Sequence, residues 1–479
     1  MGGVLVPAAV FTAALSWFLC MPNRQYSWDV LERSYLLAHW ADAPSSHRFY
    51  WAHLAELPLA RVLDVWLRTP ERPAAGLQAL ESLAAAGLFA FVTRLGWASS
   101  GQALHGLAGA IALAGSLALW WLGAGGEERV VATLALCLAA TLWTASERGE
   151  SPRVWWVVGV AFGTAVVVHL ANVVLFLWLS LLAAVRWFAR DQPTANRSYF
   201  ARVLVVLSTG AVVVGVSYAV STPIDLTRLL SYHRPLVDAR HSVFSSGIGL
   251  AAVVSENAVV AVVVWLGLIV SHGFVAVVAR RHGQLAPRTF DLWMLGVLWC
   301  LHFAFFEPEN RESWLALYVG AVALLVWRSG PLVAVRVWIG GCLATLGLVA
   351  IVANIPTITR ASTASGLETW VRAFEQHAPA GSVLVTSEGL EARAFRALSS
   401  NIRVVTIDEL YPGAVGDAYA GPSASRADVN AWIAAGVAVY CHGFTPERMH
   451  GFRFTLAKIA THRGFDILRF VSPIEPAAE

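Results

Sequence analysis

The sequence predicts an α-helical polytopic membrane protein with about eleven transmembrane helices over residues 1–361, followed by a C-terminal α/β domain over residues 362–479. Three observations predict this class. Of the 479 residues, 57% are hydrophobic and 14% are charged, whereas a soluble domain carries about 25% charged residues. Apolar runs of about 20 residues recur up to residue 361. Beyond it, short strand-like and helical segments alternate.

The composition excludes several function classes. A chain this apolar cannot cover its surface with polar groups in water, which rules out a soluble enzyme and a disordered protein. The net charge of +3 is too small for nucleic-acid binding. The single lysine, Lys458, lies outside any Walker A motif, and the five cysteines form no C-x-x-C pair. We therefore expect no nucleotide or redox cofactor.

Apolar runs and arginine positions give the membrane topology. The runs begin near Val4, Ala74, Ala103, Val130, Val154, Val203, Ser255, Leu292, Trp314 and Val335. The run from Val154 is long enough for two helices if the chain bends at residues 169–172. With a cytoplasmic N-terminus every inner loop is positively charged, as the positive-inside rule requires. We expect a bacterial plasma (inner) membrane protein whose C-terminal domain is extracytoplasmic.

The segment after residue 361 predicts a small α/β domain with a mainly parallel sheet, because strands alternate with helices. The expected strands are 382–386, 403–407, 437–440 and 465–468. The expected helices are 391–398, 427–435 and 446–460.

A long external segment, residues 22–73, separates the first two spans. Residues 29–40 have helical periodicity, and residues 48–68 have a second amphipathic pattern rich in Trp, Tyr and Leu. Helices of this kind lie in the membrane interface with their aromatic faces toward lipid. We therefore predict two interfacial helices in this segment.

Two carboxylates open the first of these helices. Asp29 and Glu32 are three residues apart and lie on one face of it. Carboxylates at a membrane surface can deprotonate an acceptor hydroxyl or hold a divalent cation. The same spacing also fits a capping box with Asp29 as the N-cap, so both interpretations stay open.

This arrangement resembles the GT-C superfamily of polyprenyl-phosphate-dependent glycosyltransferases, which includes the protein O-mannosyltransferases and the aminoarabinose transferases. In that family the acid just after the first helix is the candidate general base, which corresponds to Asp29. Many members have a second acidic motif between the third and fourth helices, and here that loop contains Glu127 and Glu128 without a D-x-D pattern. The relatives also often end in a small external α/β domain.

Polar side chains also interrupt apolar stretches. His169 and Asn172 lie near the predicted outer face, where they would line a headgroup site or simply form a loop between helices. Glu81 lies inside the second span, and an intramembrane carboxylate is a candidate site residue unless a buried partner satisfies it.

The outer loop after residue 221 is rich in arginine and histidine. We expect Arg234 and Arg240 to bind the phosphate of a polyprenyl donor, since guanidinium groups bind phosphate oxygens in pairs. The alternative is that they pair with Asp225, Asp238 or anionic lipid headgroups.

A charged turn lies between two late spans. Glu309 and Arg311 would orient the sugar or the acceptor, or the acids would only hold the arginine in place. Trp314 fits an interfacial anchor without any substrate.

Taken together, these residues predict a glycosyltransferase. It would move a sugar from a polyprenyl-phosphate donor to a glycan, lipid or protein acceptor at the extracytoplasmic face, by one inverting displacement. The alternatives are a glycan polymerase or ligase, a transporter of lipid-linked glycans, and a non-catalytic subunit of a membrane complex. A transporter is disfavoured because few charges lie midway along the spans. The carboxylates leave open whether a divalent cation takes part.

Overall fold

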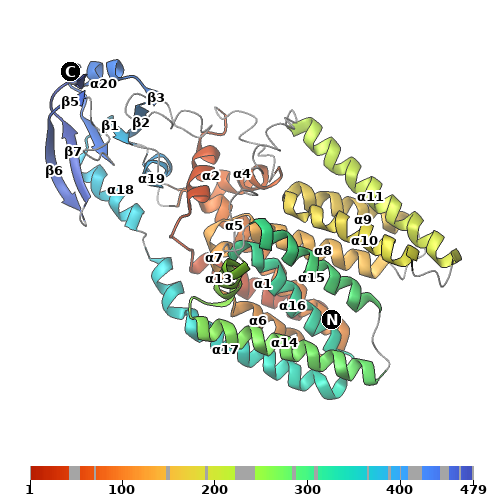
Figure 1. Cartoon of the computed structure of the whole chain (residues 1–479). Helices are drawn as coiled ribbons and strands as arrows, with labels where there is room; N and C mark the ends of the chain where they lie inside the picture. The colour runs from red at the N-terminus through yellow and green to blue at the C-terminus, as the bar shows by residue number, and fades with distance from the viewer. Residues whose placement is uncertain are drawn as a thin grey trace. The chain divides into compact units, whose positions relative to one another are not determined.

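A computed structural model gives the fold of the chain (Figure 1). It describes residues 2–41, 54–69, 72–146, 152–188, 193–221, 243–282, 287–306, 311–363, 366–386, 390–399, 401–407, 423–442, 452–462 and 465–476. The chain divides into two compact units. The helical unit comprises Met1–Asn23, Ala43–Leu63 and Leu77–Arg360, and the α/β unit comprises Arg24–Asp42, Asp64–Gly76 and Ala361–Glu479.

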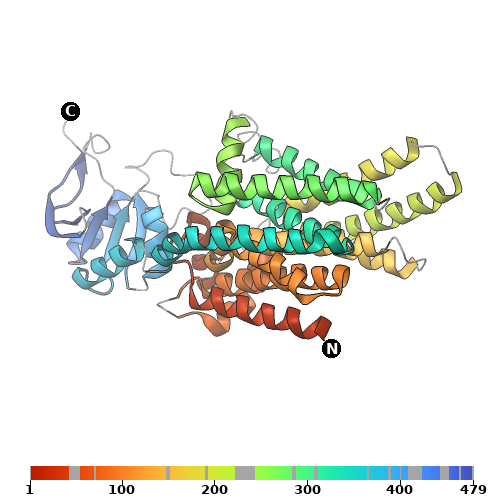
Figure 2. The same ribbon diagram turned by 90° about the horizontal axis from the view of Figure 1, so that it is seen from below.

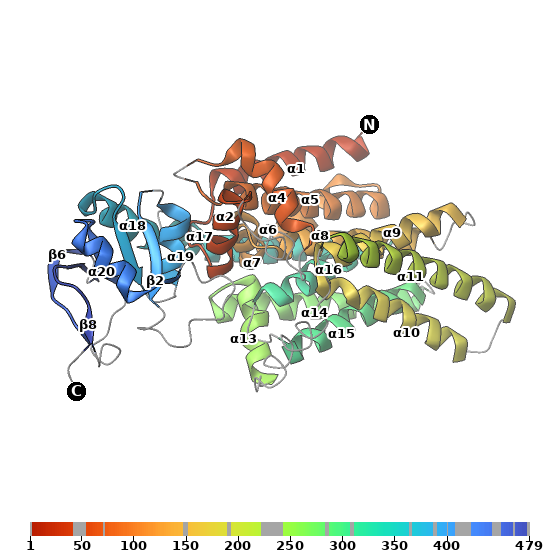
Figure 3. The ribbon, with the colours of Figure 1, turned by 90° about the horizontal axis from the view of Figure 1, so that it is seen from above.

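Long apolar helices make up most of the helical unit (Figures 2 and 3). They are α1 (Gly2–Cys20), α5 (Ala75–Ser100), α6 (Ala103–Ala114), α7 (Leu117–Gly125), α8 (Arg129–Ser146), α9 (Pro152–Val168), α10 (Val174–Phe188), α11 (Pro193–Ser221), α13 (Val243–Val254), α14 (Ala258–Arg281), α15 (Pro287–Phe306), α16 (Arg311–Ser329) and α17 (Val333–Ser362). This architecture confirms the predicted class, a polytopic α-helical membrane protein with a C-terminal α/β domain.

Within the described ranges, seven helices are long and apolar enough to cross a membrane. The pair α6 and α7, bent by 75°, would add one more span. Three shorter apolar helices cover residues 153–168, 291–302 and 314–329. Length and composition alone do not fix how many of these cross the bilayer, so the total of about eleven stays a prediction.

Polar side chains donate hydrogen bonds to backbone carbonyls at two helix ends in the helical unit. At the α6–α7 bend, Ser116 donates its hydroxyl to the carbonyl of Val253 at 2.9 Å. Asn354 of α17 donates to the carbonyls of Gly115 at 3.0 Å and Val254 at 2.7 Å. These carbonyls lie where α6 and α13 end, and a backbone group left unpaired in hydrocarbon would cost several kcal/mol. Asn354 therefore stabilises the ends of both α6 and α13.

The predicted bend between residues 169 and 172 is confirmed. Helix α9 ends at Val168, a 3-10 turn spans Leu170–Val173, and α10 follows. The ring of His169 accepts from the backbone N–H of Ala171 at 3.1 Å, which caps the turn. The long apolar run therefore makes two helices, as expected.

An aromatic core joins α8, α9, α10, α11 and α15 in the helical unit. The indole of Trp178 donates to the carbonyl of Asp291 at 2.7 Å. The Asp291 carboxylate pairs with Arg186 at 2.8 Å, and the Arg186 guanidinium lies 4.0 Å from the centre of the Tyr199 ring. Each buried polar group named here thus has a partner.

The α/β unit is built on a six-stranded sheet of order β3-β2-β1-β4-β7-β6. The strands are β1 (Val383–Thr386), β2 (Arg403–Ile407), β3 (Ser423–Ala424), β4 (Val439–His442), β6 (Leu456–His462) and β7 (Phe465–Phe470). The first four in spatial order are parallel, and the last two pair antiparallel. Strands β5 (Phe452–Arg453) and β8 (Glu475–Pro476) form a separate pair. The mainly parallel sheet is therefore confirmed.

Helices cover both faces of this sheet. Alternate residues of a strand point to opposite faces. On one face Tyr440 packs against Phe374 of α18 (Gly366–His377), with ring centres 5.1 Å apart. On the other face Val385 and Cys441 share a core with Val429 of α20 (Arg426–Ala434). Helix α19 (Leu390–Leu398) packs beside α18 through Phe395.

One predicted element is wrong. The helix expected over residues 446–460 is replaced, where the structure describes it, by β5 and β6. Leu456 and Ile459 have a helical spacing, but a bulge between Lys458 and Ala460 shifts the register of β6 against β7. The extra residue breaks the two-residue alternation, and a one-residue insertion of this kind mimics helical periodicity.

Both helices predicted in the first external segment exist where that segment is described. Helix α2 covers Trp28–Ala38 and α4 covers Glu56–Leu67. On α4, the side chains of Val62, Val65 and Trp66 are exposed. An exposed apolar face suits a helix that lies in the membrane interface, and that location stays a prediction.

Candidate active site

Asp29 lies in the first turn of α2 and is exposed. The N-cap of this helix is Ser27, whose hydroxyl oxygen accepts from the backbone N–H of Val30 at 3.2 Å. The capping interpretation of Asp29 is therefore wrong. Its carboxylate is 62% exposed and lies 4.0 Å from Arg33 one turn later. An exposed carboxylate at this position is within reach of an acceptor hydroxyl, as a general base requires.

Glu32 faces a different environment from Asp29. Its carboxylate forms an ion pair with Arg393 of α19, and both side chains are largely buried, at 13% and 7% exposure. A buried pair of this kind fastens α2 to α19 within the α/β unit. The sequence indicated Glu32, with Asp29, as a candidate site residue, and the structure gives its carboxylate a protein partner.

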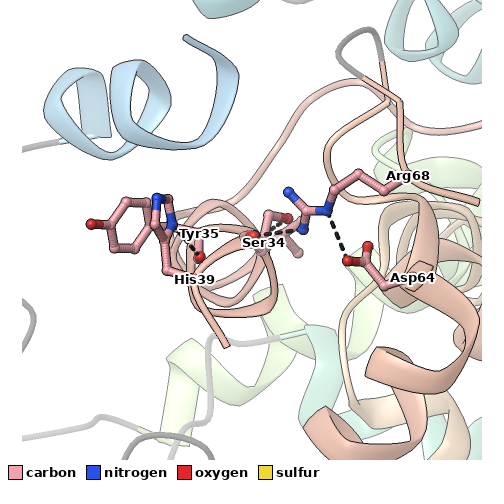
Figure 4. Close-up of polar contacts among 6 residues, drawn as sticks. Ser34, Tyr35, His39, Asp64 and Arg68 are labelled. Atoms are coloured by element: carbon pink, nitrogen blue, oxygen red, sulfur yellow. Dashed lines mark hydrogen bonds and ion pairs between the residues drawn. The ribbon is translucent and has the colours of Figure 1, made fainter. Parts of the chain in front are cut away.

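A second contact holds the C-terminal half of α2 (Figure 4). Arg68, just after α4, donates to the backbone carbonyl of Ser34 at 2.6 Å and to the Asp64 carboxylate at 2.7 Å. The Asp64 side chain is fully buried. His39, at the end of α2, bonds to the carbonyl of Tyr35 at 3.0 Å and its ring lies against the Tyr35 ring. The position of α2 is thus set by Asp64 and Arg68 as well as by α19.

Sequence reasoning missed a cluster beside the start of α2. Glu368 of α18 is buried and pairs with Arg372 at 2.9 Å and Arg24 at 3.9 Å. Burial raises the pKa of Tyr26 to about 12, Glu368 acts in the same direction, and Arg24, Arg72 and Arg372 oppose it. Arg24 of the external segment and Arg372 of α18 therefore pair with one buried acid, and no local pattern signals the pairing with Arg24.

In the helical unit, Glu127 and Glu128 lie in the turn between α7 and α8 and are buried. Gly126 ends α7 in the left-handed region with φ of 91°, which turns the chain toward them. Glu81 of α5 accepts from the backbone N–H groups of Val130 and Val131 at 3.1 and 3.0 Å. The intramembrane carboxylate thus caps α8 and fixes the turn that bears the two acids.

Glu127 is hydrogen bonded to Glu312 in the first turn of α16, which the sequence did not single out as a site residue. Burial raises the pKa of Glu312 well above its ordinary value, and the charge and hydrogen bond of Glu127 add to this. The guanidinium of Arg129 lies 3.6 Å from Glu312 and opposes the shift. Glu312 precedes the apolar part of α16, which begins at Trp314. Two carboxyl groups joined in this way share one proton.

Arg311 lies beside this pair. Its guanidinium is 4.0 Å from the centre of a Trp121 ring. Burial lowers the pKa of Arg311, and the charges of Glu127 and Glu312 oppose that shift. Glu127, Glu312 and Arg311 therefore come together from α7–α8 and α16, and can donate and accept hydrogen bonds to a polar ligand.

The remaining predicted residues fall into two groups. His169 and Asn172 are buried and bond to backbone groups, with Asn172 donating to the carbonyls of Ala132 and Ala165 at 3.1 and 2.9 Å. Arg234, Arg240 and Glu309 lie outside the described residues. In the ranges that the structure does describe, no three His, Cys, Asp or Glu side chains are grouped to hold a metal ion.

An apolar cavity of about 500 Å³ runs between α5, α8, α14, α15 and α16. Its lining includes Leu136, Trp299, Ala316, Gly320, Leu324 and Trp327. Ala316 is one helical turn beyond Glu312, so along α16 the cavity begins near the acidic pair. A cavity of this composition suits a hydrocarbon chain.

The fold and these features define a multi-helix membrane protein with a small C-terminal α/β domain. Among solved structures, the chain is similar to ArnT from Cupriavidus metallidurans, with a TM-score of 0.62, 12% identity and 98% coverage of both chains. The same protein bound to undecaprenyl phosphate gives a TM-score of 0.64 at 10% identity, again with 98% coverage of both chains. The resemblance predicted from sequence is thus confirmed for the fold.

A weaker likeness is to an oligosaccharyltransferase of Archaeoglobus fulgidus, with a TM-score of 0.46, 12% identity, and 83% and 63% of the two chains covered. No protein-family model and no curated protein matches the sequence.

Proposed function

We propose that the protein is a glycosyltransferase that moves a sugar from a polyprenyl-phosphate donor to an acceptor at the extracytoplasmic face of the membrane. The observation that carries this proposal is the likeness over 98% of the chain to ArnT, which was solved with undecaprenyl phosphate bound. Asp29 adds chemical support, because it follows the first helix and its carboxylate is exposed. The positive inner loops support the choice of face.

The reaction is a single inverting displacement. The Asp29 carboxylate takes the proton of the acceptor hydroxyl, and the acceptor oxygen forms a bond to the anomeric carbon of the sugar. The bond from that carbon to the phosphate oxygen breaks, and the polyprenyl phosphate leaves with the bonding electrons. Arg234 and Arg240 stabilise the charge that develops on this leaving group.

The helical unit supplies the contacts to sugar and lipid in this proposal. The protonated and ionised members of the Glu127–Glu312 pair offer a donor and an acceptor to sugar hydroxyls, and Arg311 adds a further donor. Glu128, whose charge also acts on Glu312, contributes to the same polar site. Glu309 is a candidate contact from the sequence alone and lies outside the described residues. The apolar cavity beside α16 holds part of the isoprenoid chain. We assign no substrate contact to His169 and Asn172, whose hydrogen bonds give them a structural role.

The test uses the purified full-length protein in nanodiscs with a radiolabelled polyprenyl-phosphate sugar and a bacterial envelope extract as acceptor. We expect covalent transfer of label by the wild type. The Asp29→Asn variant should lose transfer and keep donor binding. The matched control is Asp466→Asn, which changes an exposed aspartate of β7 to the same amide.

Three outcomes would contradict the proposal. Unchanged turnover in Asp29→Asn would exclude Asp29 as the base. Movement of intact donor across the bilayer without covalent transfer would favour a transporter. Growth of a glycan chain on the lipid itself would favour a polymerase.

A further inference from the structure

We infer that the C-terminal α/β domain sets the position of the helix that bears Asp29, and that Arg393 is the positioning residue through which it does so. The inference rests on the proposed role of Asp29 as the base. It gives the domain a part in the chemical step itself, in addition to any part in binding the acceptor.

The first argument is the way the chain divides. Residues 24–42, which include α2, belong to the same compact unit as residues 361–479. The backbone N–H of Arg24 donates to the carbonyl of Ala361 at 2.8 Å. On α2 itself Leu31 and Leu37 are fully or almost fully buried. Helix α2 therefore belongs to the α/β unit, although it is distant from the domain in sequence.

The second argument is the ion pair that joins α2 to the domain. Glu32 is one helical turn after Asp29, and its carboxylate pairs with Arg393 of α19. Because both side chains are largely buried, removal of either one leaves a charge in a site poorly reached by water. Either α2 rotates or moves outward until that charge is solvated, or the charge is neutralised by proton exchange, and in both cases the ion pair no longer fastens α2 to α19. Asp29 loses its fixed position with that contact, since both residues belong to adjoining turns of the same helix.

The third argument is that Arg393 is itself held on a fixed support. Phe395, two residues later, packs edge-on against Trp370 and Phe374 of α18, with ring centres 4.6 and 5.1 Å away. Phe374 packs in turn against Tyr440 of β4 at 5.1 Å. Contacts thus run without a gap from the central sheet through α18 and α19 to Arg393, and from there to the helix of Asp29.

A base must lie within hydrogen-bond reach of the proton that it removes. A misplacement of about 1 Å can lower turnover by about 100-fold without weakening substrate binding. Loss of Arg393 should therefore lower kcat and leave the KM for the donor lipid nearly unchanged. A domain that served only to bind the acceptor would instead show its effect in the KM for the acceptor.

The experiment compares four full-length variants in nanodiscs: Arg393→Gln, Arg393→Lys, the double variant Glu32→Arg with Arg393→Glu, and the control Arg453→Gln on β5. We expect Arg393→Gln to lower kcat by about 100-fold with a donor KM within about twofold of wild type. Arg393→Lys keeps the charge and should recover part of the rate. The double variant restores an ion pair and should recover more than Arg393→Gln. The exposed Arg453 should have no effect.

Hydrogen exchange of the α2 amides gives a readout that does not depend on activity. We expect faster exchange over residues 30–38 in Arg393→Gln, with recovery in the double variant and no change in the control. Wild-type kcat together with unchanged exchange in Arg393→Gln would overturn the inference. If Arg393→Gln fails to fold, the double variant replaces it in the test. The inference is overturned if the double variant folds, shows wild-type hydrogen exchange over α2 and is still inactive. Absence of transfer by the wild type would count against the proposed function, while the exchange data would still test the support of α2.

Discussion

Glu127, in the turn before α8, is hydrogen bonded to Glu312 in the first turn of α16. The two carboxyl groups come from distant parts of the chain, and burial with mutual repulsion raises the pKa of Glu312 well above 4.5. The pair therefore keeps a proton at a pH where isolated glutamates have lost theirs.

This shared proton predicts a pH dependence of stability. A group whose pKa is higher in the folded state binds more protons there, so its contribution is full below about pH 4.5 and is lost as the pH rises through the raised pKa. The free energy of unfolding of the wild type, relative to Glu312→Gln, should fall with rising pH by up to about 1.4 kcal/mol per unit. Melting temperatures of both proteins across pH 4–9 check this.

Asp466 provides the control of opposite sign. Hydrogen bonds from Lys458 and Thr461 lower its pKa, so its stabilising contribution is present at high pH and is lost on acidification. The free energy of unfolding of the wild type, relative to that of Asp466→Asn, should therefore not fall as the pH rises. Parallel melting curves for the wild type and Glu312→Gln would contradict the shared proton.

The carboxylate of Glu81 predicts a stability effect inside the membrane. It accepts two backbone N–H groups at the start of α8, and Glu81→Ala leaves both without this acceptor. A lost helix cap in a buried site costs about 2 kcal/mol. We expect a melting temperature several degrees lower, and a smaller fall in Glu81→Gln, which keeps one acceptor oxygen. Arg94→Gln, at an exposed position of the same helix, is the control.

Much of the fold is predictable because its signals are local. Apolar runs gave the helices of the helical unit, and His169 with Asn172 marked the break between α9 and α10. The parallel strands followed from alternation with helices. The helix predicted over β6 failed because the bulge near Lys458 imitates helical spacing.

The candidate site is less predictable, because its pairings join distant segments. Glu32 and Asp29 look equivalent in the sequence, yet only Glu32 has a buried arginine partner, Arg393. Glu312 lies in a sequence segment rich in acidic residues, and no pattern in that segment predicts its hydrogen bond to Glu127. Patterns show which residue types are present, whereas these partners depend on tertiary packing.

Arg68 predicts a second stability effect, in the α/β unit. Arg68→Met removes the 2.7 Å ion pair with the buried Asp64 and the hydrogen bond to the carbonyl of Ser34. Breaking a buried pair from one side costs about 3 kcal/mol. We expect a lower melting temperature and faster hydrogen exchange at the end of α2, measured on the same sample. Arg453→Met, at an exposed arginine of β5 in the same unit, is the matched control. Equal losses in both variants would mean that the Asp64 contact contributes little.

The apolar cavity predicts a dependence of activity on the length of the donor lipid. Gly320 lines the cavity and has open space around the position of a Cβ, so Gly320→Leu puts a side chain into the cavity without displacing the backbone. If an isoprenoid chain occupies this space, the variant should raise the KM for a long-chain donor by about tenfold, since displacing about two buried methylenes costs about 1.6 kcal/mol. A donor with a short isoprenoid chain should be unaffected.

Gly341→Leu is the matched control for this test. Gly341 lies on α17, also has open space around its Cβ position, and is not part of the cavity lining. Both substitutions replace a helical glycine by leucine and should stabilise their helices by a similar amount, about 0.8 kcal/mol. A rise in KM that is specific to Gly320→Leu and to long donors therefore reports occupancy of the cavity. An equal rise in KM for short donors would mean instead that the substitution disturbs the polar site at Glu312. Glu312 lies one helical turn before Ala316, where the cavity lining on α16 begins.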